Sequence, residues 1–339
     1  MSKTTLKKLA EKLNLSVGTV SKALKDYPDI SESTKKRVKA LVKELNYKPN
    51  SFAQNLRNQE SKIIGLIIPQ VVHHFFANII LGVTEAAEKK GYLVIVLESA
   101  ESYETEKKHL DLLLKRNVDG LLISLADNTI KYNHIIDIIN QDHPIVLYDK
   151  ISKSIDCHKV VIDDKKAAYN ATKFLIKNVG CKKVAHIRGP LKPQTTIDRF
   201  QGYKNALKEY HIPFDKTIVF ESKHLTFEDG EKIAEEIIKN KEIDGVFAFT
   251  DLLAAGVLKG LLEAEVKVPE EISVIGFSNW LLTKMTSPTL STVDQPGYKM
   301  GIQAFNLLHE EIKSRKNNIR IRHRTIELPT KLIIRNSTK

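Results

Sequence analysis

The sequence has few cysteines and no long apolar run, and we expect no secretory leader. Its two cysteines, Cys157 and Cys181, form neither a CxxC pair nor a Cys/His metal pattern. This excludes a disulfide scaffold and predicts half-buried thiols in a reducing cytoplasm. No stretch of 18 apolar residues occurs, so the sequence predicts no membrane-spanning helix and no membrane partner. The basic, amphipathic N-terminus lacks the apolar core and small-residue cleavage site of a secretory signal.

Motifs for catalysis are also missing. The sequence contains no P-loop and no GxSxG, HExxH or GxGxxG fingerprint. His73 and His74 are adjacent and cannot share one helix face, so we interpret them as histidines of a surface or cleft lip rather than as a metal pair. We therefore expect no enzyme activity, no cofactor and no metal.

Positive charge is concentrated near the N-terminus. The 339 residues carry 53 Lys and Arg against 41 Asp and Glu, a net charge of +12. The first 60 residues contain 13 basic and 6 acidic side chains, which is more than half of the excess. This asymmetry indicates a polyanionic partner, either nucleic acid or anionic lipid, for the N-terminal segment. The alternative is a solvated basic surface.

Apolar residues at helical spacing predict three short helices, over residues 5–13, 16–24 and about 31–45. Thr5 and Ser16 are suitable N-caps for the first two. Asn14 lies where the chain must turn sharply, and asparagine tolerates the left-handed conformation. The pattern predicts a helix-turn-helix, although a generic three-helix bundle has similar spacing. Basic side chains of the third helix are expected to face outward or to lie along its edges: Lys35, Lys36, Arg37, Lys39 and Lys43.

The second helix of such a motif enters the major groove of DNA with its N-terminus first. Its outward residues are Val17, Gly18, Ser21 and Lys22. Lys22 can reach a guanine edge. Hydroxyl groups suited to phosphate oxygens come from Ser16, Thr19 and Ser21.

A short polar segment follows the three helices. Pro49 ends the third helix, and Asn50 can cap a further helix over residues 51–57. A helix of this length is marginal alone, so it would order only against DNA or a second copy of the chain. Leu56 is a large apolar residue on this polar stretch and resembles the wedges that minor-groove proteins insert between base steps. An ordinary linker is the alternative.

From Ser61 onward, apolar runs alternate with helical patterns. The run KIIGLIIP is typical of a strand buried on both faces. Two successive sets of strand–helix alternation predict two similar subdomains. The predicted fold is an all-α helix-turn-helix head followed by an α/β body of two doubly wound parallel-sheet subdomains.

Polar side chains follow several of the predicted strands, where ligands of open α/β sheets bind. Carboxylates, amides, an arginine and aromatic rings together suit a small polyol, and a sugar is the expected ligand. For any single aspartate the alternative is a helix N-cap. The residues in question are Phe75, Phe76, Asp149, Asp163, Arg199, Thr250, Asp251, Ser278, Asn279 and Trp280.

The segments TLKKLAEKLNLSVGTVSKAL and ISESTKKRVKALVKELNYKPNSFAQNLR resemble the N-terminus of the lactose-repressor/galactose-repressor family of bacterial transcription regulators. The resemblance implies that Val17, Gly18 and Lys22 face bases and that Asn50, Ala53 and Leu56 enter the minor groove. The full set of expected DNA-binding residues is Thr5, Leu6, Ser16, Val17, Gly18, Thr19, Ser21, Lys22, Asn50, Ala53, Gln54 and Leu56.

The body is similar to the regulatory core of the same family, in segments such as DRFQGY, VPEEISVIGFSN and SPTLSTVDQPGYKMG. That core is similar to periplasmic sugar-binding proteins. The likeness implies a homodimer and chain crossings between subdomains near residues 160, 290 and 320. It also implies that an effector cleft is lined by Phe75, Asp149, Asp163, Arg199, Asp251, Asn279 and Gln295.

These observations predict three regions: a DNA-binding domain over residues 1–46, a hinge with a short helix over 47–61, and an effector-binding and dimerisation domain over 62–339. Within the body we expect an N-subdomain of about 62–160 plus 291–320 and a C-subdomain of about 161–290 plus 321–339. The predicted function is a sequence-specific transcription regulator, of the repressor type, with double-stranded operator DNA and a small-molecule effector, a sugar or sugar derivative, as partners. Its expected place is the cytoplasm, on the nucleoid.

Two other function classes account for less of the chain. A sugar-binding transport protein would explain only the body of the chain. The expected lack of a secretory signal peptide argues against this class. A sugar-transforming enzyme would need a positioned acid/base pair, which carboxylates alone do not demonstrate.

Overall fold

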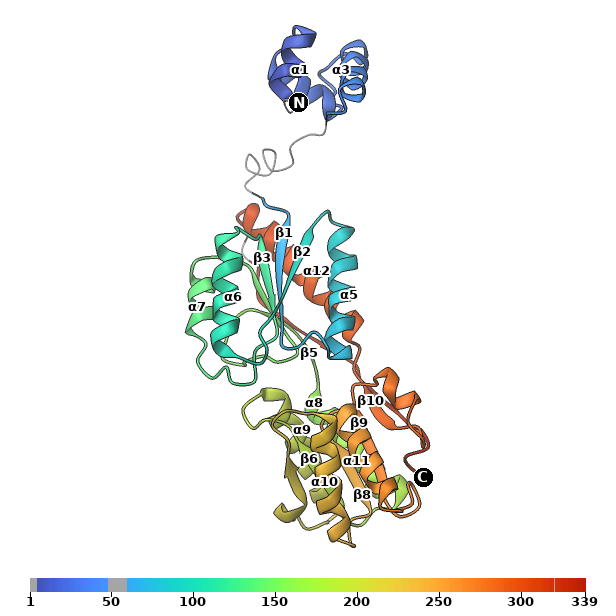
Figure 1. The fold of residues 1–339 in the computed structure, drawn as a ribbon. Coiled ribbons are helices and arrows are strands. Elements are labelled where there is room, and N and C mark those ends of the chain that lie inside the picture. The colour runs from blue at the N-terminus through green and yellow to red at the C-terminus, as the bar shows by residue number, and fades with distance from the viewer. Residues whose placement is uncertain (1–4, 48–59, 320) are drawn as a thin grey trace. The chain divides into compact units, whose positions relative to one another are not determined.

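The computed structural model describes residues 5–47, 60–319 and 321–339. The chain divides into two units, Met1–Ser61 and Lys62–Lys339, and each is described by itself (Figure 1). Within the described ranges, the helices are too short or too polar to cross a membrane. The predicted short helix of residues 51–57 lies outside the described residues, as do Asn50, Ala53, Gln54 and Leu56.

The first unit contains the three predicted helices, α1 (Leu6–Leu13), α2 (Val17–Leu24) and α3 (Glu32–Glu44). Thr5 and Ser16 cap α1 and α2, since their hydroxyls accept from backbone N–H groups three residues later. Asn14 adopts the left-handed conformation between them, with φ 51° and ψ 44°. Their packed core, formed by Leu9, Val20 and Val38 among others, fixes α2 against α1 and α3.

Lys35 is more buried than expected for a residue on the outer side or edge of the third helix. Lys35 is not an outward residue of α3, because its side chain is only 10% exposed and its ammonium pairs with Glu32 at 2.8 Å. A long aliphatic stem can lie along an apolar surface while the charged end reaches a partner, and the apolar spacing alone does not reveal this.

The second unit contains two parallel-dominated sheets. The first sheet has the strand order β11-β5-β4-β3-β1-β2, and its paired neighbours are all parallel. Its elements are β1 (Ile63–Ile68), α5 (His74–Glu88), β2 (Leu93–Glu98), α6 (Tyr103–Lys115), β3 (Gly120–Ile123), α7 (Asn133–Asn140), β4 (Ile145–Tyr148), β5 (His158–Ile162), α12 (Gly297–Lys316) and β11 (Thr325–Leu328).

The second sheet has the order β12-β10-β9-β8-β6-β7, with β12 antiparallel to β10 and the other neighbours parallel. A π-helical turn, Leu175–Val179, extends its first helix. Its elements are α8 (Asp164–Phe174), β6 (Val184–Arg188), α9 (Gln194–Glu209), β7 (Val219–Glu221), α10 (Phe227–Lys239), β8 (Gly245–Ala248), α11 (Asp251–Glu263), β9 (Ser273–Phe277), β10 (Ser291–Asp294) and β12 (Lys331–Ile333).

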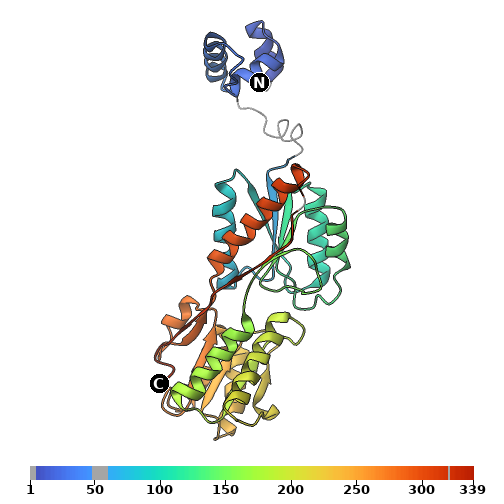
Figure 2. The ribbon, with the colours of Figure 1, turned by 180° about the vertical axis from the view of Figure 1, so that it is seen from behind.

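Helices cover both faces of each sheet, as the continuous apolar strands predicted. In the first sheet, α5 and α12 cover one face and α6 and α7 the other; Figure 2 shows α12 lying across its face. In the second, α8 and α9 face α10 and α11 across the strands. Both cysteines are unpaired and buried, more deeply than expected. The predicted fold class is confirmed.

The chain crossings expected near residues 290 and 320 lie a few residues further along the chain. Residues 291–294 form β10, which pairs with β9 in the second sheet rather than belonging to the first subdomain. Residues 325–328 form β11, which pairs with β5 in the first sheet rather than belonging to the second subdomain. Short strands at these positions complete a sheet built from distant segments, so their partner depends on long-range packing that local patterns do not contain.

Candidate functional site

The body contains a cavity of about 890 Å³ at the carboxyl ends of the strands of both sheets. Its lining comes from the loops after β1 to β4 of the first sheet and after β6 to β10 of the second. Parallel strands bring their carboxyl ends to one edge, so loops from distant parts of the sequence converge here. The volume lies within the range of about 300–1,000 Å³ that is typical of small-molecule sites.

Arg199 of α9 lines the cavity and is only 4% exposed. Its Nε donates to the Asp164 carboxylate at 2.7 Å, and its Nη1 donates to the Phe249 carbonyl at 2.8 Å. The guanidinium carbon lies 4.4 Å from the ring centre of Phe249 and 3.6 Å from that of Phe277. The plane of the guanidinium is therefore fixed by an ion pair and by two aromatic faces.

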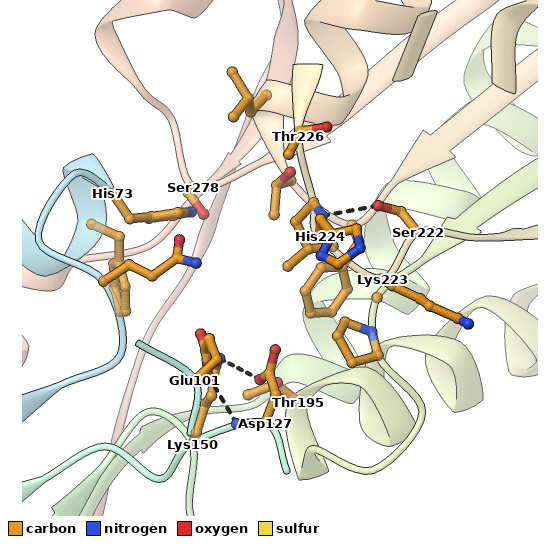
Figure 3. A pocket seen from close by; sticks show the side chains of 18 of the residues that line it. His73, Glu101, Asp127, Lys150, Thr195, Ser222, Lys223, His224, Thr226 and Ser278 are labelled. Atoms are coloured by element: carbon orange, nitrogen blue, oxygen red, sulfur yellow. Dashed lines mark hydrogen bonds and ion pairs between the residues drawn. The ribbon is translucent and has the colours of Figure 1, made fainter. Parts of the chain in front are cut away.

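A second charged group lies on the side of the first sheet. Lys150 donates to Glu101 at 2.6 Å and also to Asp127, and these interactions are drawn in Figure 3. Burial alone would lower the pKa of Lys150, but the charges of Glu101 and Asp127 outweigh it and raise the pKa above its ordinary value. Lys150 therefore stays protonated and holds together the loops that follow β2, β3 and β4.

Asp149, the residue before Lys150, is also buried at the cavity, with 8% exposure. Burial and the nearby charge of Asp164 raise its pKa to about 7, against the opposing effect of Lys150 and Arg199. Asp149 has a left-handed backbone, with φ 55°. Four other lining residues share positive φ values, namely Ala100, Glu101, Leu225 and Ser278. Such conformations tend to gather at functional sites, where the surrounding structure holds them in place.

Several polar atoms of the cavity lining are buried without a hydrogen-bond partner among the described residues. They are Thr195 Oγ1, Gln295 Nε2, Trp280 Nε1 and His73 Nδ1. Ser278 donates to Gln295 Oε1 at 2.6 Å, which leaves the amide nitrogen of that glutamine for a ligand. Since an unsatisfied buried polar group costs about 1–3 kcal/mol, these atoms indicate a polar ligand.

Aromatic rings give the same cavity apolar surfaces. Phe75, Phe76 and Phe249 line it, and Trp280 packs edge-on against His73 with ring centres 4.5 Å apart. His73 and Ser278 lie across the cavity from Ser222 and His224 (Figure 3). Burial and the nearby charge of Lys150 lower the pKa of His73 to about 3, so the imidazole is neutral.

The head presents a second candidate site on α2. Val17, Gly18 and Lys22 are exposed, and Val17 is an apolar side chain with 44% exposure. Ser16 Oγ lies 2.9 Å from Thr19 Oγ1, so two hydroxyls gather at the N-terminus of this helix. An exposed apolar side chain beside hydroxyls and a helix N-terminus is a surface suited to base edges and phosphates.

Comparison with known proteins identifies the family. Residues 5–50 match the model of the bacterial regulatory proteins of the lacI family. Residues 61–335 match the model of the periplasmic binding proteins and sugar binding domain of the LacI family. The chain belongs to the LacI family.

Similarity to individual members extends along the chain. The HTH-type transcriptional repressor PurR of Vibrio atlanticus is 32% identical, with 99% of this chain and 98% of the relative covered. A LacI family transcriptional regulator from Enterococcus faecium, solved with bound ribose, is 27% identical with a TM-score of 0.72, and the match covers 81% of this chain and 98% of that one. The Lac repressor dimer, solved with operator and the anti-inducer ONPF, has 21% identity and a TM-score of 0.86 over 99% of both chains, and this likeness shows the fold.

Four of the seven residues predicted to line the effector cleft of this LacI-family chain do line the cavity. These are Phe75, Asp149, Arg199 and Gln295. The other three predicted residues, Asp163, Asp251 and Asn279, are not among the lining residues.

Each of those three has a structural partner instead. Asp163 caps α8 by accepting from the Lys166 backbone N–H at 2.8 Å, which is the alternative foreseen for a single aspartate. Asp251 is fully buried and accepts from Thr292 Oγ1 at 2.5 Å and from the Trp280 backbone at 2.8 Å.

Asn279 joins two C-terminal segments behind the cavity. It donates to Asp294 at 2.8 Å and accepts from Arg335 at 2.7 Å. Together with Asp251, it fixes the loop after β9 that carries Ser278 and Trp280 into the cavity.

Among the residues expected to bind DNA, Thr5 and Ser16 serve as N-caps in the structure, and Leu6 packs against the core of the head. Thr19 and Ser21 are half-buried on α2. Lys22 pairs with Asp29 at 2.5 Å, a contact that the sequence did not suggest.

Sequence reasoning missed Glu101, Asp127, Lys150 and Thr195 as cavity residues, and His73 was assigned only to a surface or cleft lip. The first three follow β2, β3 and β4, so the strand-end rule that selected Asp149 would also have selected them. Thr195 lies in the first turn of α9, where its only signal was proximity to the strand end of β6.

We predict that Asp149→Asn alters how stability depends on pH. The folded state holds the Asp149 proton up to about pH 7, whereas the unfolded chain releases it near the ordinary value of 3.8. Between these values the folded state binds more protons, so stability falls as pH rises, by about 1.4 kcal/mol per pH unit from this group.

The measurement is urea unfolding of the natural chain and of Asp149→Asn at pH 5, 6 and 7. The difference in unfolding free energy should move steadily against the natural chain as pH increases. Parallel pH curves for the two proteins would show that Asp149 ionises normally in the folded state.

Proposed function

We propose that the chain is a homodimeric repressor that binds operator DNA and a sugar effector, and that effector binding changes its affinity for the operator. Residues 1–46 form the DNA-binding domain, residues 47–61 the hinge, and residues 62–339 the effector-binding and dimerisation domain. The protein acts in the cytoplasm, on the nucleoid. LacI-family membership supports a regulator rather than an enzyme.

The observation that carries the effector proposal is the fixed guanidinium of Arg199 at a cavity with buried donors and aromatic faces. Hydrogen-bonding groups of the cavity can bind the hydroxyls of a sugar, and its aromatic rings can pack against the apolar face of the sugar. The ribose bound to the Enterococcus faecium regulator supports a sugar for this chain as well. We assign effector contacts to Phe75, Asp149, Arg199 and Gln295.

For DNA, the proposal places α2 in the major groove with Val17, Gly18 and Lys22 toward bases. Asn50, Ala53 and Leu56 are proposed to reach the minor groove, with Leu56 as an apolar wedge, and Gln54 is proposed to contact the DNA. Two copies of the chain would present two α2 helices to two half-sites of a roughly symmetric operator. The Lac repressor, solved as a dimer with operator, supports this arrangement.

A gel shift tests the whole proposal. The full chain is mixed with DNA from upstream of its own gene, with and without each member of a sugar panel. We expect a specific complex whose stability is changed by one sugar. Absence of any upstream complex at low salt would refute operator binding, and a complex indifferent to every sugar would refute the sugar effector.

Arg199→Ala should abolish the response to the cognate sugar while operator binding persists. The substitution removes a planar pair of donors, and losing a charge-assisted hydrogen bond costs roughly 1.5–3 kcal/mol, or about 10–150-fold in affinity. Calorimetry with the cognate sugar measures this loss.

Because Arg199→Ala leaves the buried Asp164 carboxylate unpaired, Arg199→Lys serves as a companion that keeps the charge. Thermal unfolding checks that both variants are folded. Sugar affinity unchanged in a folded Arg199→Ala protein would remove Arg199 from the effector site.

Lys22→Ala should relax base preference at one position of each half-site. Lys22 and Asp29 are 50% and 51% exposed, and surface ion pairs contribute little, so the ammonium can exchange this partner for a guanine edge. We expect a loss of about 1–3 kcal/mol on the specific operator.

Lys25→Ala is the control, because Lys25 is an exposed lysine at the C-cap of α2, three residues after Lys22. Binding is measured on the operator and on single-base variants of it. If Lys22→Ala weakens all of these sequences equally, Lys22 contacts only phosphates.

A further inference from the structure

Three helices of the body begin at the cavity without a side-chain cap. They are α5, α9 and α12, whose N-cap residues His73, Pro193 and Pro296 make no capping hydrogen bond. Their first turns contain no acidic residue. By contrast, α6, α8, α10 and α11 each have both a side-chain cap and an acidic residue in the first turn. An uncapped N-terminus carries free N–H donors and a partial positive charge.

Buried side-chain donors at two of these N-termini lack partners among the described residues. Thr195, in the first turn of α9, is 4% exposed, and its hydroxyl makes no hydrogen bond. Gln295, which comes just before α12, is 7% exposed, and its amide nitrogen is unpartnered. Both residues line the cavity. The lining therefore offers more donors than acceptors to a ligand.

The carboxylates near the cavity do not offset this excess of hydrogen-bond donors. Glu101 and Asp127 form ion pairs with Lys150, and Asp164 forms an ion pair with Arg199. Burial gives Asp149 a pKa of about 7, which leaves it partly protonated at neutral pH.

The rim of the cavity adds mobile positive charge. Lys192, two residues before α9, and Lys223 are exposed, and neither forms an ion pair within the described residues. The ammonium of Lys223 points away from the other labelled side chains (Figure 3). A lysine stem is flexible enough to swing its ammonium toward a ligand. Glu221 is an exposed carboxylate on the same rim.

We propose that the effector is a sugar phosphate whose phosphate group lies at the N-terminus of α9, bound by Thr195 and Lys192. A neutral sugar presents hydroxyls that both donate and accept, whereas a phosphate presents only acceptors and a negative charge. A phosphate therefore matches the free backbone N–H groups of α9, the unpartnered hydroxyl of Thr195 and the ammonium of Lys192. This inference rests on the proposed function, since it names the chemical class of the effector for the same cavity.

The single tryptophan of the chain, Trp280, lines the cavity and gives a direct signal for ligand binding. Its fluorescence in the full chain is titrated with matched pairs of ribose and ribose 5-phosphate and of glucose and glucose 6-phosphate. Glucuronate and inorganic phosphate are titrated alongside. We expect a phosphorylated sugar to bind at least tenfold more tightly than its neutral parent and inorganic phosphate to compete with it.

Two variants locate the phosphate. Lys192→Glu and Thr195→Val should each reduce the preference for phosphorylated over neutral sugar by about tenfold. Lys208→Glu is the matched control, since Lys208 is exposed in the last turn of the same helix. It should leave the preference unchanged.

Three results would overturn the inference: equal affinity for neutral and phosphorylated sugars, glucuronate binding as tightly as glucose 6-phosphate, or no response of Trp280 to any phosphate-bearing probe at millimolar concentration. Operator binding is measured on the same samples, so the two proposals fail separately. A neutral sugar that alters operator binding would keep the proposed function and reject the phosphate. A chain that binds no operator would reject the proposed function itself.

Discussion

The ion pair between Arg199 and Asp164 is the interaction on which the cavity depends most. It joins α9 to α8, and the same guanidinium binds the carbonyl of Phe249 after β8 and stacks on Phe277 at the end of β9. Removing one partner of such a pair leaves a buried charge uncompensated, which costs roughly 3–5 kcal/mol. A charged group this constrained is available to a ligand in one fixed orientation, so the wall of the cavity is organised before an effector arrives.

The parallel topology supplies the other half of the arrangement. Both sheets turn the carboxyl ends of their strands to the same cavity, so the loops that follow them, and the N-termini of the helices beyond, meet there. Three of these helices, α5, α9 and α12, lack side-chain caps, whereas α6, α8, α10 and α11 have them. A chain selected only for stability would cap all of them, because a cap is worth about 1 kcal/mol. The missing caps leave backbone donors for a ligand.

The sequence was sufficient for the fold class, for the three helices of the head and for the left-handed turn at Asn14, because these depend on local periodicity and local conformation. It was less informative about the site. Asp149 and Asp163 both follow apolar strands, yet only Asp149 lines the cavity, while Asp163 caps α8. The local sequence does not distinguish a cavity-lining aspartate from a helix N-cap, because the loop geometry after each strand decides which role the side chain has. The pairing of β10 and β11 depended in the same way on contacts between segments far apart in the chain.

We propose that ligand binding in the cavity between the two sheets is coupled to operator binding by the head. The most direct measurement is operator affinity, by fluorescence anisotropy of labelled DNA, before and after saturation with a ligand that changes the fluorescence of Trp280. Allosteric coupling of about 1–3 kcal/mol predicts a change of roughly 5–150-fold in operator affinity. A ligand that saturates the Trp280 signal and leaves operator affinity unchanged would contradict the account.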